Sequence, residues 1–194
     1  MPRETTGQRE SARRDQIVAA ATDFVLEHGL IGLSLRPLAA ALGTSDRMLL
    51  YHFTSKDDLV AAVLRESNDR SVAQIRALAA RGSVREEVLA LWSAMNEPDL
   101  DRCQRVYVEA AALGLLGQEP YASVVREANA AWARALADRL SEAGALRTRV
   151  DRAVMLMDAA FMGFQLDLPV ESRPAVEVAV RDLADAVEAV AGAG

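Results

Sequence analysis

The chain has 194 residues and a net charge of −6; 51% of its residues are hydrophobic and 5% are aromatic. This length allows one or two domains with a buried core, and the composition favours helices over sheets. The single cysteine, Cys103, excludes an internal disulfide framework and a CxxC metal site. The polar start has no apolar signal segment, and no run of about 18 apolar residues occurs, so we expect a soluble, cytoplasmic protein.

The acidic charge is unevenly distributed. Residues 1–56 hold seven basic and six acidic side chains, a net charge of +1, so the remainder carries −7. A protein that binds nucleic acid needs positive charge where it meets phosphates and does not need a basic body. The asymmetry has the direction expected of such a protein but is weak, and charge alone does not identify the function.

Helical periodicity extends over almost the whole chain, and no segment is a convincing strand. Residues 1–9 are predicted to form a flexible arm. The first helix is predicted over residues 11–28, because Ile17, Phe24 and Val25 share one face and Gly29 can end it.

Two short helices are predicted next. Ser34 can cap the second helix, and Pro37 falls in its first turn, where a missing N–H costs little. Gly43 ends this helix. Ser45 can cap the third helix, which puts Asp46 in the first turn, where the helix dipole favours an anion.

The fourth helix is predicted to begin at Ser55, with Asp58 as a capping-box partner, and to end near residue 80. Caps and breakers beyond it predict five more helices. They lie near residues 83–96, 99–116, 119–143, 149–168 and 172–191. The predicted fold class is therefore all-α, with about nine helices: an N-terminal three-helix helix-turn-helix domain and a C-terminal helical domain.

Residues 34–59 have the layout of a helix-turn-helix, which lays its second helix in the major groove of DNA. The side chains predicted to form its core are Leu35, Leu38, Leu42, Leu49 and Phe53. Polar side chains then remain on the exposed side of the third helix and at its two ends. The predicted DNA contacts are Ser34, Arg36, Thr44, Ser45, Asp46, Arg47, Met48, Tyr51, His52 and Lys56, the only lysine.

These contacts have different predicted roles. Arg47 could donate two hydrogen bonds to guanine, or it could contact a phosphate or lie in solvent. Asp46 could accept from cytosine N4 or only cap its helix. Tyr51, His52 and Lys56 are predicted to hold phosphates, although the first two could be satisfied polar residues at a helix junction. No metal site is predicted, because His52 has no other ligand at suitable spacing.

The same segment resembles the DNA-binding domain of the tetracycline-repressor (TetR) family of bacterial transcription regulators. The resemblance covers roughly the first 60 residues. It rests on Gly29, Ser34, Leu38-Ala39, Gly43-Thr44-Ser45, Tyr51-His52-Phe53 and Ser55-Lys56 followed by Leu59. Asp46, Arg47 and Leu50 depart from the residues that are frequent at these places in the family. These departures leave the fold unaffected and concern the DNA sequence that is read.

The resemblance implies a helix-turn-helix domain over residues 1–54 and a ligand-binding and dimerisation domain over residues 55–194. It also implies a ligand-responsive regulator, in the usual case a repressor, which binds a palindromic operator in double-stranded DNA as a homodimer. A small, largely apolar effector would release it, and the fourth helix would carry the shift. No catalytic arrangement and no cofactor are expected. The alternative is a helical dimeric adaptor or ligand-sequestering protein that has lost sequence-specific DNA binding.

Two further groups of residues are predicted in the C-terminal part. The dimer interface is predicted from an apolar stripe near the C-terminus and one face of the helix before it: Val176, Val180, Leu183, Val187, Val190, Val154, Asp158 and Met162. The ligand pocket is predicted from large or pliable side chains with a polar anchor: Trp92, Met95, Tyr107, Trp132, Met155, Phe161, Phe164 and Gln165. Glu109 is a second possible anchor. For both groups the alternative is an ordinary intramolecular core.

Overall fold

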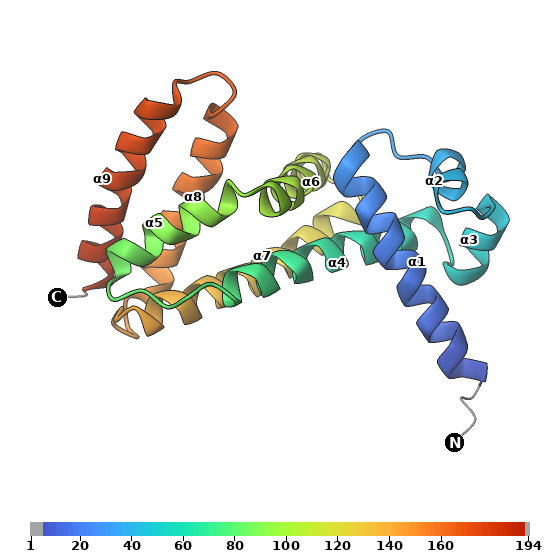
Figure 1. Cartoon of the computed structure of the whole chain (residues 1–194), viewed down its shortest axis with the longest axis horizontal. Helices are drawn as coiled ribbons and strands as arrows, with labels where there is room; N and C mark the ends of the chain where they lie inside the picture. The colour runs from blue at the N-terminus through green and yellow to red at the C-terminus, as the bar shows by residue number, and fades with distance from the viewer. Residues whose placement is uncertain (1–5, 193–194) are drawn as a thin grey trace. The chain divides into compact units, whose positions relative to one another are not determined.

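The computed structural model describes residues 6–192, and within this range the chain forms nine α-helices and no strand (Figure 1). Their bounds are α1 Thr6–His28, α2 Leu35–Ala41, α3 Asp46–His52, α4 Lys56–Arg76, α5 Val84–Met95, α6 Pro98–Leu115, α7 Tyr121–Glu142, α8 Val150–Asp167 and α9 Arg173–Ala191. The predicted all-α fold is therefore confirmed. None of these helices is long and apolar enough to cross a membrane.

The predicted boundaries agree with the structure within a few residues, with one exception at the N-terminus. α1 begins at Thr6, so the predicted flexible arm is wrong for residues 6–9; residues 1–5 lie outside the described range. The segment from Gln8 to Glu10 contains good helix formers and no breaker, so nothing in it stops the helix from extending beyond its apolar face. α4 ends at Arg76, about one turn before the predicted residue 80.

The chain divides into two compact units, and each has its own hydrophobic core. The first unit contains the described residues up to Ser71 together with Asp101–Ala128. The second contains Val72–Leu100 and the described residues from Asn129 onward. α4, α6 and α7 each contribute to both units, so the packing boundary does not coincide with the predicted division between residues 54 and 55. That division stays a prediction about function.

The core of the first unit surrounds the helix-turn-helix. Leu38, Leu49 and Phe53, three of the five predicted core residues, are buried, and Leu35 and Leu42 pack against them partly buried. Other elements supply the rest of this core: Ile17, Val25, Leu59, Val106, Ala110 and Val124 are among the buried side chains of α1, α4, α6 and α7. The short helices α2 and α3 are therefore packed against longer helices.

The second unit is organised around α9, which packs against both α5 and α8 (Figure 1). Val176, Val180, Leu183 and Val187 are buried in this core, and Val190 packs against it. Val154 on α8 is buried there too. These side chains are not available to a second subunit, so the stripe predicted as a dimer interface belongs to the core of its own chain. Amphipathicity shows which face of a helix is buried and does not show what covers that face.

An ion pair is buried in the second unit. Arg139 Nε lies 2.7 Å from Glu87 Oε1 and its Nη2 lies 2.9 Å from Glu87 Oε2, with the two side chains 5% and 1% exposed. Arg139 also donates to the carbonyl oxygens of Leu78 and Ala79, just after the end of α4. One guanidinium therefore satisfies a buried carboxylate and two backbone acceptors.

We expect Glu87→Leu or Arg139→Met alone to destabilise the fold by about 3–5 kcal/mol, because each leaves a buried charge without its partner. The double variant should cost less than the sum of the two single variants, since it leaves neither charge unpaired. Urea unfolding of all three variants measures these costs. The control is Asp185→Ala, which breaks the exposed Arg85–Asp185 pair (2.5 Å) and should cost less than about 1 kcal/mol. A cost of the double variant equal to the sum of the two single costs would contradict the assignment of a buried ion pair.

Candidate nucleic-acid interface and ligand-binding residues

The turn between α2 and α3 is closed by backbone hydrogen bonds around a glycine. Gly43 has φ +62°, in the left-handed region, and its N–H donates to the Ala40 carbonyl at 3.1 Å. The Thr44 N–H then donates to the Ala39 carbonyl at 2.9 Å. A side chain at position 43 would make this conformation strained. The glycine therefore fixes the direction in which α3 leaves the turn.

α3 is capped as predicted, whereas α2 is not. Ser45 Oγ accepts a hydrogen bond from the Met48 N–H at 3.3 Å. Ser34 occupies the N-cap position of α2 but makes no side-chain capping bond. The Ser34 hydroxyl is exposed and is not used by the helix that it precedes.

The start of α4 is held by a reciprocal set of bonds. The Asp58 N–H donates to Ser55 Oγ at 3.1 Å, and Asp58 Oδ2 accepts from the Thr54 N–H at 3.1 Å. This is close to the predicted capping box. Lys56 Nζ donates to the Leu33 carbonyl, so the lysine joins the beginning of α4 to the loop before α2. Lys56 thus has a structural partner as well as an exposed side chain.

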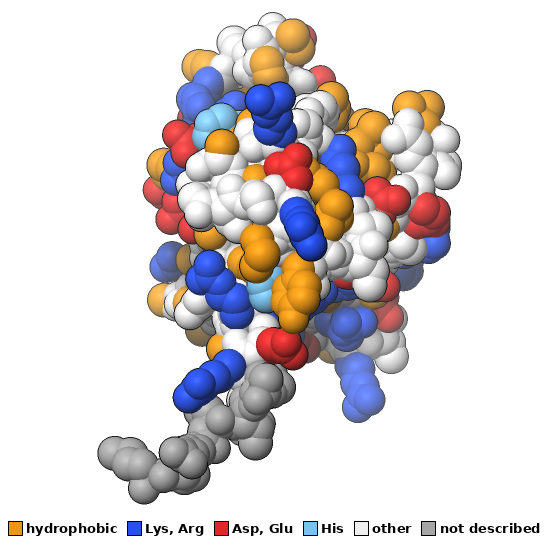
Figure 2. Space-filling model, turned by 90° about the vertical axis from the view of Figure 1, so that its right-hand side faces the viewer, with side chains coloured by type: hydrophobic (Ala, Val, Ile, Leu, Met, Phe, Trp, Pro, Cys, Tyr) orange, Lys and Arg blue, Asp and Glu red, His pale blue; other side chains and the backbone are white. Residues whose placement is uncertain are grey.

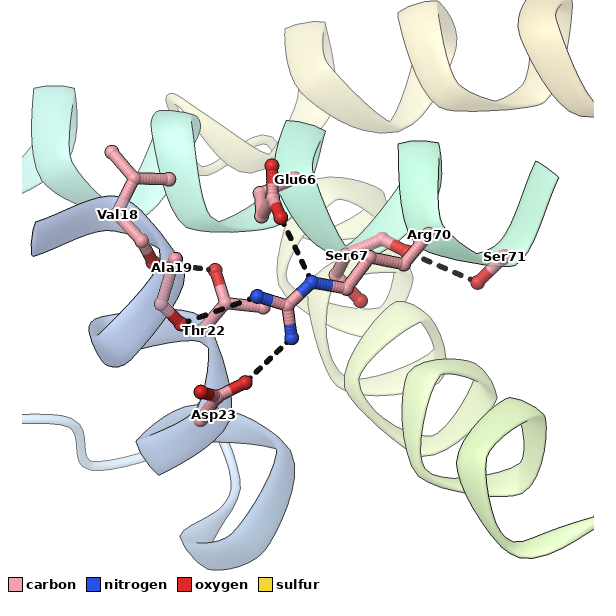
Figure 3. Close-up of polar contacts among 8 residues, drawn as sticks. All are labelled: Val18, Ala19, Thr22, Asp23, Glu66, Ser67, Arg70 and Ser71. Carbon is pink, nitrogen blue, oxygen red and sulfur yellow. Dashed lines mark hydrogen bonds and ion pairs between the residues drawn. The ribbon is translucent and has the colours of Figure 1, made fainter. Parts of the chain in front are cut away.

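A cluster of polar contacts fixes α1 to α4 (Figure 3). Arg70 on α4 donates to Asp23 at 2.6 Å, to Glu66 at 2.8 Å and to the Ala19 carbonyl at 3.3 Å. The guanidinium lies between the two helices and uses acceptors from both. Because α3 packs within the same unit, this contact helps to hold the support on which the interface is built.

α6 contacts the end of α1 through Glu109. Its Oε2 accepts hydrogen bonds from the backbone N–H groups of Leu30 and Ile31, at 2.7 and 2.6 Å. Gly29 before them has φ +87°, and a Cβ there would lie 3.1 Å from Glu109 Oε1. Glu109 is therefore bonded to the α1–α2 loop. Its suggested role as an anchor in the ligand pocket is not supported by this position.

The predicted DNA contacts lie together on the surface of the first unit. Asp46, Arg47, Met48 and Tyr51 on α3 are exposed, as are Ser34, Arg36 and Ser45, and Thr44 and His52 are half-buried. The Tyr51 hydroxyl donates to Glu10 at 3.3 Å, so a phosphate contact would have to replace this bond. Figure 2 shows a face on which Lys and Arg side chains are interspersed with hydrophobic and acidic ones.

Two further side chains lie among the predicted contacts: Arg13, which the sequence interpretation left out, and Leu50, which it named only as a departure that concerns the DNA sequence read. Arg13 on α1 lines a shallow hollow of about 90 Å³ together with Thr44, Met48 and His52. Leu50 on α3 is exposed among the polar residues. The position of Arg13, one turn before buried Ile17, was a usable signal. Arg14, its neighbour, is instead bonded to Asp58 (3.4 Å) and lies 4.7 Å from the ring centroid of Phe53.

The residues predicted to form a pocket are distributed over both units. Trp92, Met95 and Phe161 are buried in the second unit, with Trp132, Phe164 and Gln165 half-buried there. Tyr107 is half-buried in the first unit, and its grouping with the others stays a prediction. Met155 is 76% exposed, so the expectation that it lines a pocket in this chain is corrected.

Asp158 and Trp132 form the main polar contact among these helices. Trp132 Nε1 on α7 donates to Asp158 Oδ1 on α8 at 2.9 Å. Burial raises the pKa of the Asp158 carboxyl, and the indole hydrogen bond partly opposes this change. Among residues 6–192, no group of three or more His, Cys, Asp or Glu side chains could hold a metal ion.

Comparison with known proteins agrees with the geometry of the first unit. Residues 17–63 match the family model described as bacterial regulatory proteins, tetR family. The match covers the helix-turn-helix segment, about a quarter of the chain. The chain is 40% identical over 76 residues to the HTH-type transcriptional regulator RutR of Escherichia coli strain K12, a match that spans 38% of this chain and only 36% of RutR. An uncharacterised HTH-type transcriptional regulator of Mycobacterium tuberculosis is 28% identical over 132 residues, 68% of this chain and 50% of that protein. These relatives are regulators by name, and the chain spans only 36% and 50% of their length.

Solved structures share the fold over nearly the whole chain. A TetR-family transcriptional regulator from Rhodococcus sp. has a TM-score of 0.72 at 24% identity, covering 93% of this chain and 98% of that one. The multidrug binding protein EbrR, complexed with proflavin, has a TM-score of 0.68 at 23% identity and covers 90% and 99%. A regulator from Saccharomonospora viridis in complex with choline has a TM-score of 0.66 at 22% identity and covers 92% and 96%.

We expect Glu109→Ala to destabilise the chain by about 1–3 kcal/mol, because two backbone N–H groups lose a charged acceptor. Glu109→Gln should cost less, since the amide oxygen still accepts. Urea unfolding measures both changes. Glu127→Ala is the matched control: it removes an exposed partner of Arg65 (2.9 Å) and should cost less than about 1 kcal/mol. Equal costs for Glu109→Ala and Glu127→Ala would show that the Glu109 contact stabilises the chain no more than an exposed ion pair does.

Proposed function

We propose that this chain is a ligand-responsive transcriptional regulator, a repressor that binds a palindromic operator as a homodimer. The observation that carries the proposal is the exposed polar surface of α3, held by a glycine turn and a serine cap within the segment that matches the family. A helix in this setting has the geometry of a recognition helix. The site of action is then bacterial DNA in the cytoplasm.

The chemistry of α3 separates sequence reading from phosphate binding. Arg47 is exposed and has five donors, which suit the O6 and N7 acceptors of guanine. Leu50 and Met48 offer apolar contact to thymine methyl groups. Ser34, Arg36 and Lys56 lie at the helix starts on either side, where contacts to phosphates position the protein without reading bases.

A homodimer is supported by an exposed apolar stripe on α8. Met155, Ala159 and Leu166 are exposed and recur at spacings of four and seven residues, so they share one face of the helix, and Val170 is exposed just beyond its end. Met155 and Leu166 are 76% and 56% exposed. We assign this face to a second copy of the chain, because a palindromic operator requires two recognition helices related by two-fold symmetry. Of the three residues predicted for the interface on α8, Val154 is buried in its own chain and Asp158 and Met162 are half-buried, so we propose the exposed face with Met155 in their place.

Response to a small molecule is supported by the solved structures that carry choline and proflavin in the same fold. α4 and α6 both run through the boundary between the two units, and α6 holds the α1–α2 loop through Glu109. An effector that favours one arrangement of these helices would change the spacing of the two recognition helices. Operator affinity then falls by no more than the effector's differential affinity for the two states.

The alternative is a dimeric adaptor or ligand-sequestering protein that has lost DNA binding. The acidic Asp46 at the start of α3 and the weakly basic first 56 residues favour it. A gel-shift assay with the intergenic DNA beside its gene separates the two functions. A bound sequence selected from random DNA, with inverted symmetry, supports the regulator, and absence of any selected sequence supports the adaptor.

We expect Arg47→Ala to relax the preference at one base pair of the operator by about 1–3 kcal/mol. Lys56→Ala should weaken binding to all sequences alike and reduce the salt dependence by about one counterion. Gel shifts over a range of salt concentrations and single-base operator variants measure both effects. Unfolding of Lys56→Ala is the control for its bond to the Leu33 carbonyl. Unchanged DNA binding in both variants would contradict the assigned contacts.

We expect Leu166→Glu to convert the dimer to a monomer and to lower operator affinity, because it places two symmetry-related charges in an apolar interface. Sedimentation measures the assembly and a gel shift measures the affinity. Leu115→Glu is the matched control: Leu115 is 88% exposed at the end of α6, outside the proposed interface. A Leu166→Glu protein that remains dimeric would place the interface elsewhere.

A further inference from the structure

α8 presents three different faces in the second unit. Met157 and Phe161 face the core, and the apolar stripe that begins at Met155 lies on the exposed side. Asp158 and Gln165, seven residues apart, share a flank between these two faces. Two polar side chains with acceptor oxygens therefore lie two turns apart on one half-buried edge of an otherwise apolar helix.

The carboxylate of Asp158 is only partly satisfied. Oδ1 accepts from the neutral Nε1–H group of Trp132, and burial and this hydrogen bond are the two influences on the pKa of the carboxyl. A half-buried carboxylate with a single neutral donor is costly to keep charged, which is consistent with the raised pKa of Asp158. A positive group placed beside it would recover most of that cost.

Gln165 leaves a second acceptor unused. Its Oε1 is buried and has no hydrogen-bond donor within the part of the chain that the structure describes. Buried polar atoms are almost always paired, and an unpaired one costs about 1–3 kcal/mol. An N–H or O–H group from a bound molecule would satisfy this oxygen.

Aromatic rings lie in the same unit, and one of them, Trp132, contacts this flank through Asp158. Trp92 on α5 is 5.2 Å from Phe161 and 5.9 Å from Phe164, measured between ring centroids, and the second pair is edge-on. Trp132 and Phe164, which are only half-buried, offer apolar contact and the negative ring faces that attract organic cations. The combination of rings with a carboxylate favours a positively charged ligand over a neutral apolar one.

We propose that Asp158, Trp132 and Gln165 anchor the effector, and that the effector is an organic cation carrying an N–H or O–H donor. This inference rests on the proposed ligand response and specifies its chemical class. It changes the expectation drawn from sequence, which was a largely apolar effector, and it moves Asp158 from the dimer interface to the ligand site. The alternative is that these rings form an ordinary core, which binds a neutral ligand or no ligand.

The test compares cations with neutral molecules of the same shape, by calorimetry on the full chain. One pair is choline and 3,3-dimethylbutan-1-ol, in which carbon replaces the charged nitrogen. The other pair is tyramine and 4-propylphenol, in which a methyl group replaces the ammonium group. In at least one pair the cation should bind about tenfold or more tightly than its neutral partner, because only the cation gains the carboxylate and the ring faces.

Asp158→Asn keeps the shape of the side chain and an acceptor for Trp132. It should therefore abolish the preference for the cation and leave the affinity for the neutral molecule of the pair unchanged. Gln165→Leu should weaken, by several-fold, the binding of a cation that carries an N–H or O–H donor. Asp151→Asn, at an exposed carboxylate on the first turn of α8, is the control and should keep the full preference. Equal binding within both pairs, or a preference that survives Asp158→Asn, would overturn the inference.

Operator binding without ligand distinguishes this inference from the proposed function. Asp158→Asn should bind the operator as the unaltered chain does. A chain that binds its operator but prefers no cation contradicts only the cation anchor. A chain that prefers cations through Asp158 but binds no DNA supports the anchor and contradicts only the regulator.

Discussion

The length of α2 and α3 is the constraint on which the interface depends. Each has seven residues, far fewer than an isolated helix needs to be stable in water. Their stability comes from Leu38, Leu49 and Phe53, which are buried against α1, α4 and parts of α6 and α7. The exposed side of α3 is therefore free to carry polar side chains, because its buried side already supplies the packing energy.

The same constraint explains why the sequence predicted the helix-turn-helix itself and did not predict the boundary of the unit that supports it. Ser45, Gly43 and Asp58 act through short-range backbone bonds, so their residue types and spacing predict the local structure. The support by α6 comes from Glu109, which lies 78 and 79 residues from the N–H groups that it accepts. No local pattern contains that information. The packing boundary falls within α4, α6 and α7, and for this reason the sequence did not predict it.

The errors on α8 and α9 have a single physical origin. A helix with apolar residues on two sides gives two possible assignments, and the sequence does not state which side meets its own chain. Val176, Val180 and Leu183 are covered by α5 and α8, whereas Met155 remains exposed. Adjacent residues differ by about 100° around a helix, so choosing Val154 in place of Met155 exchanges the core for the surface. Burial decides the matter because it reports the neighbours directly.

The division of α8 into three faces matches one observed role, packing in the core, and the two roles proposed for it. Its core face fixes its position against α9, its exposed face is assigned to a second copy, and its polar flank is assigned to a cation. A ligand that pairs with Asp158 would compensate a desolvated charge, so it would bind most tightly to the arrangement in which the carboxylate is most enclosed. Because Met155 and Asp158 are on the same rigid helix, such an arrangement also sets the orientation of the stripe that the second copy meets. Under these two proposals, ligand charge and dimer geometry would be linked through α8 itself.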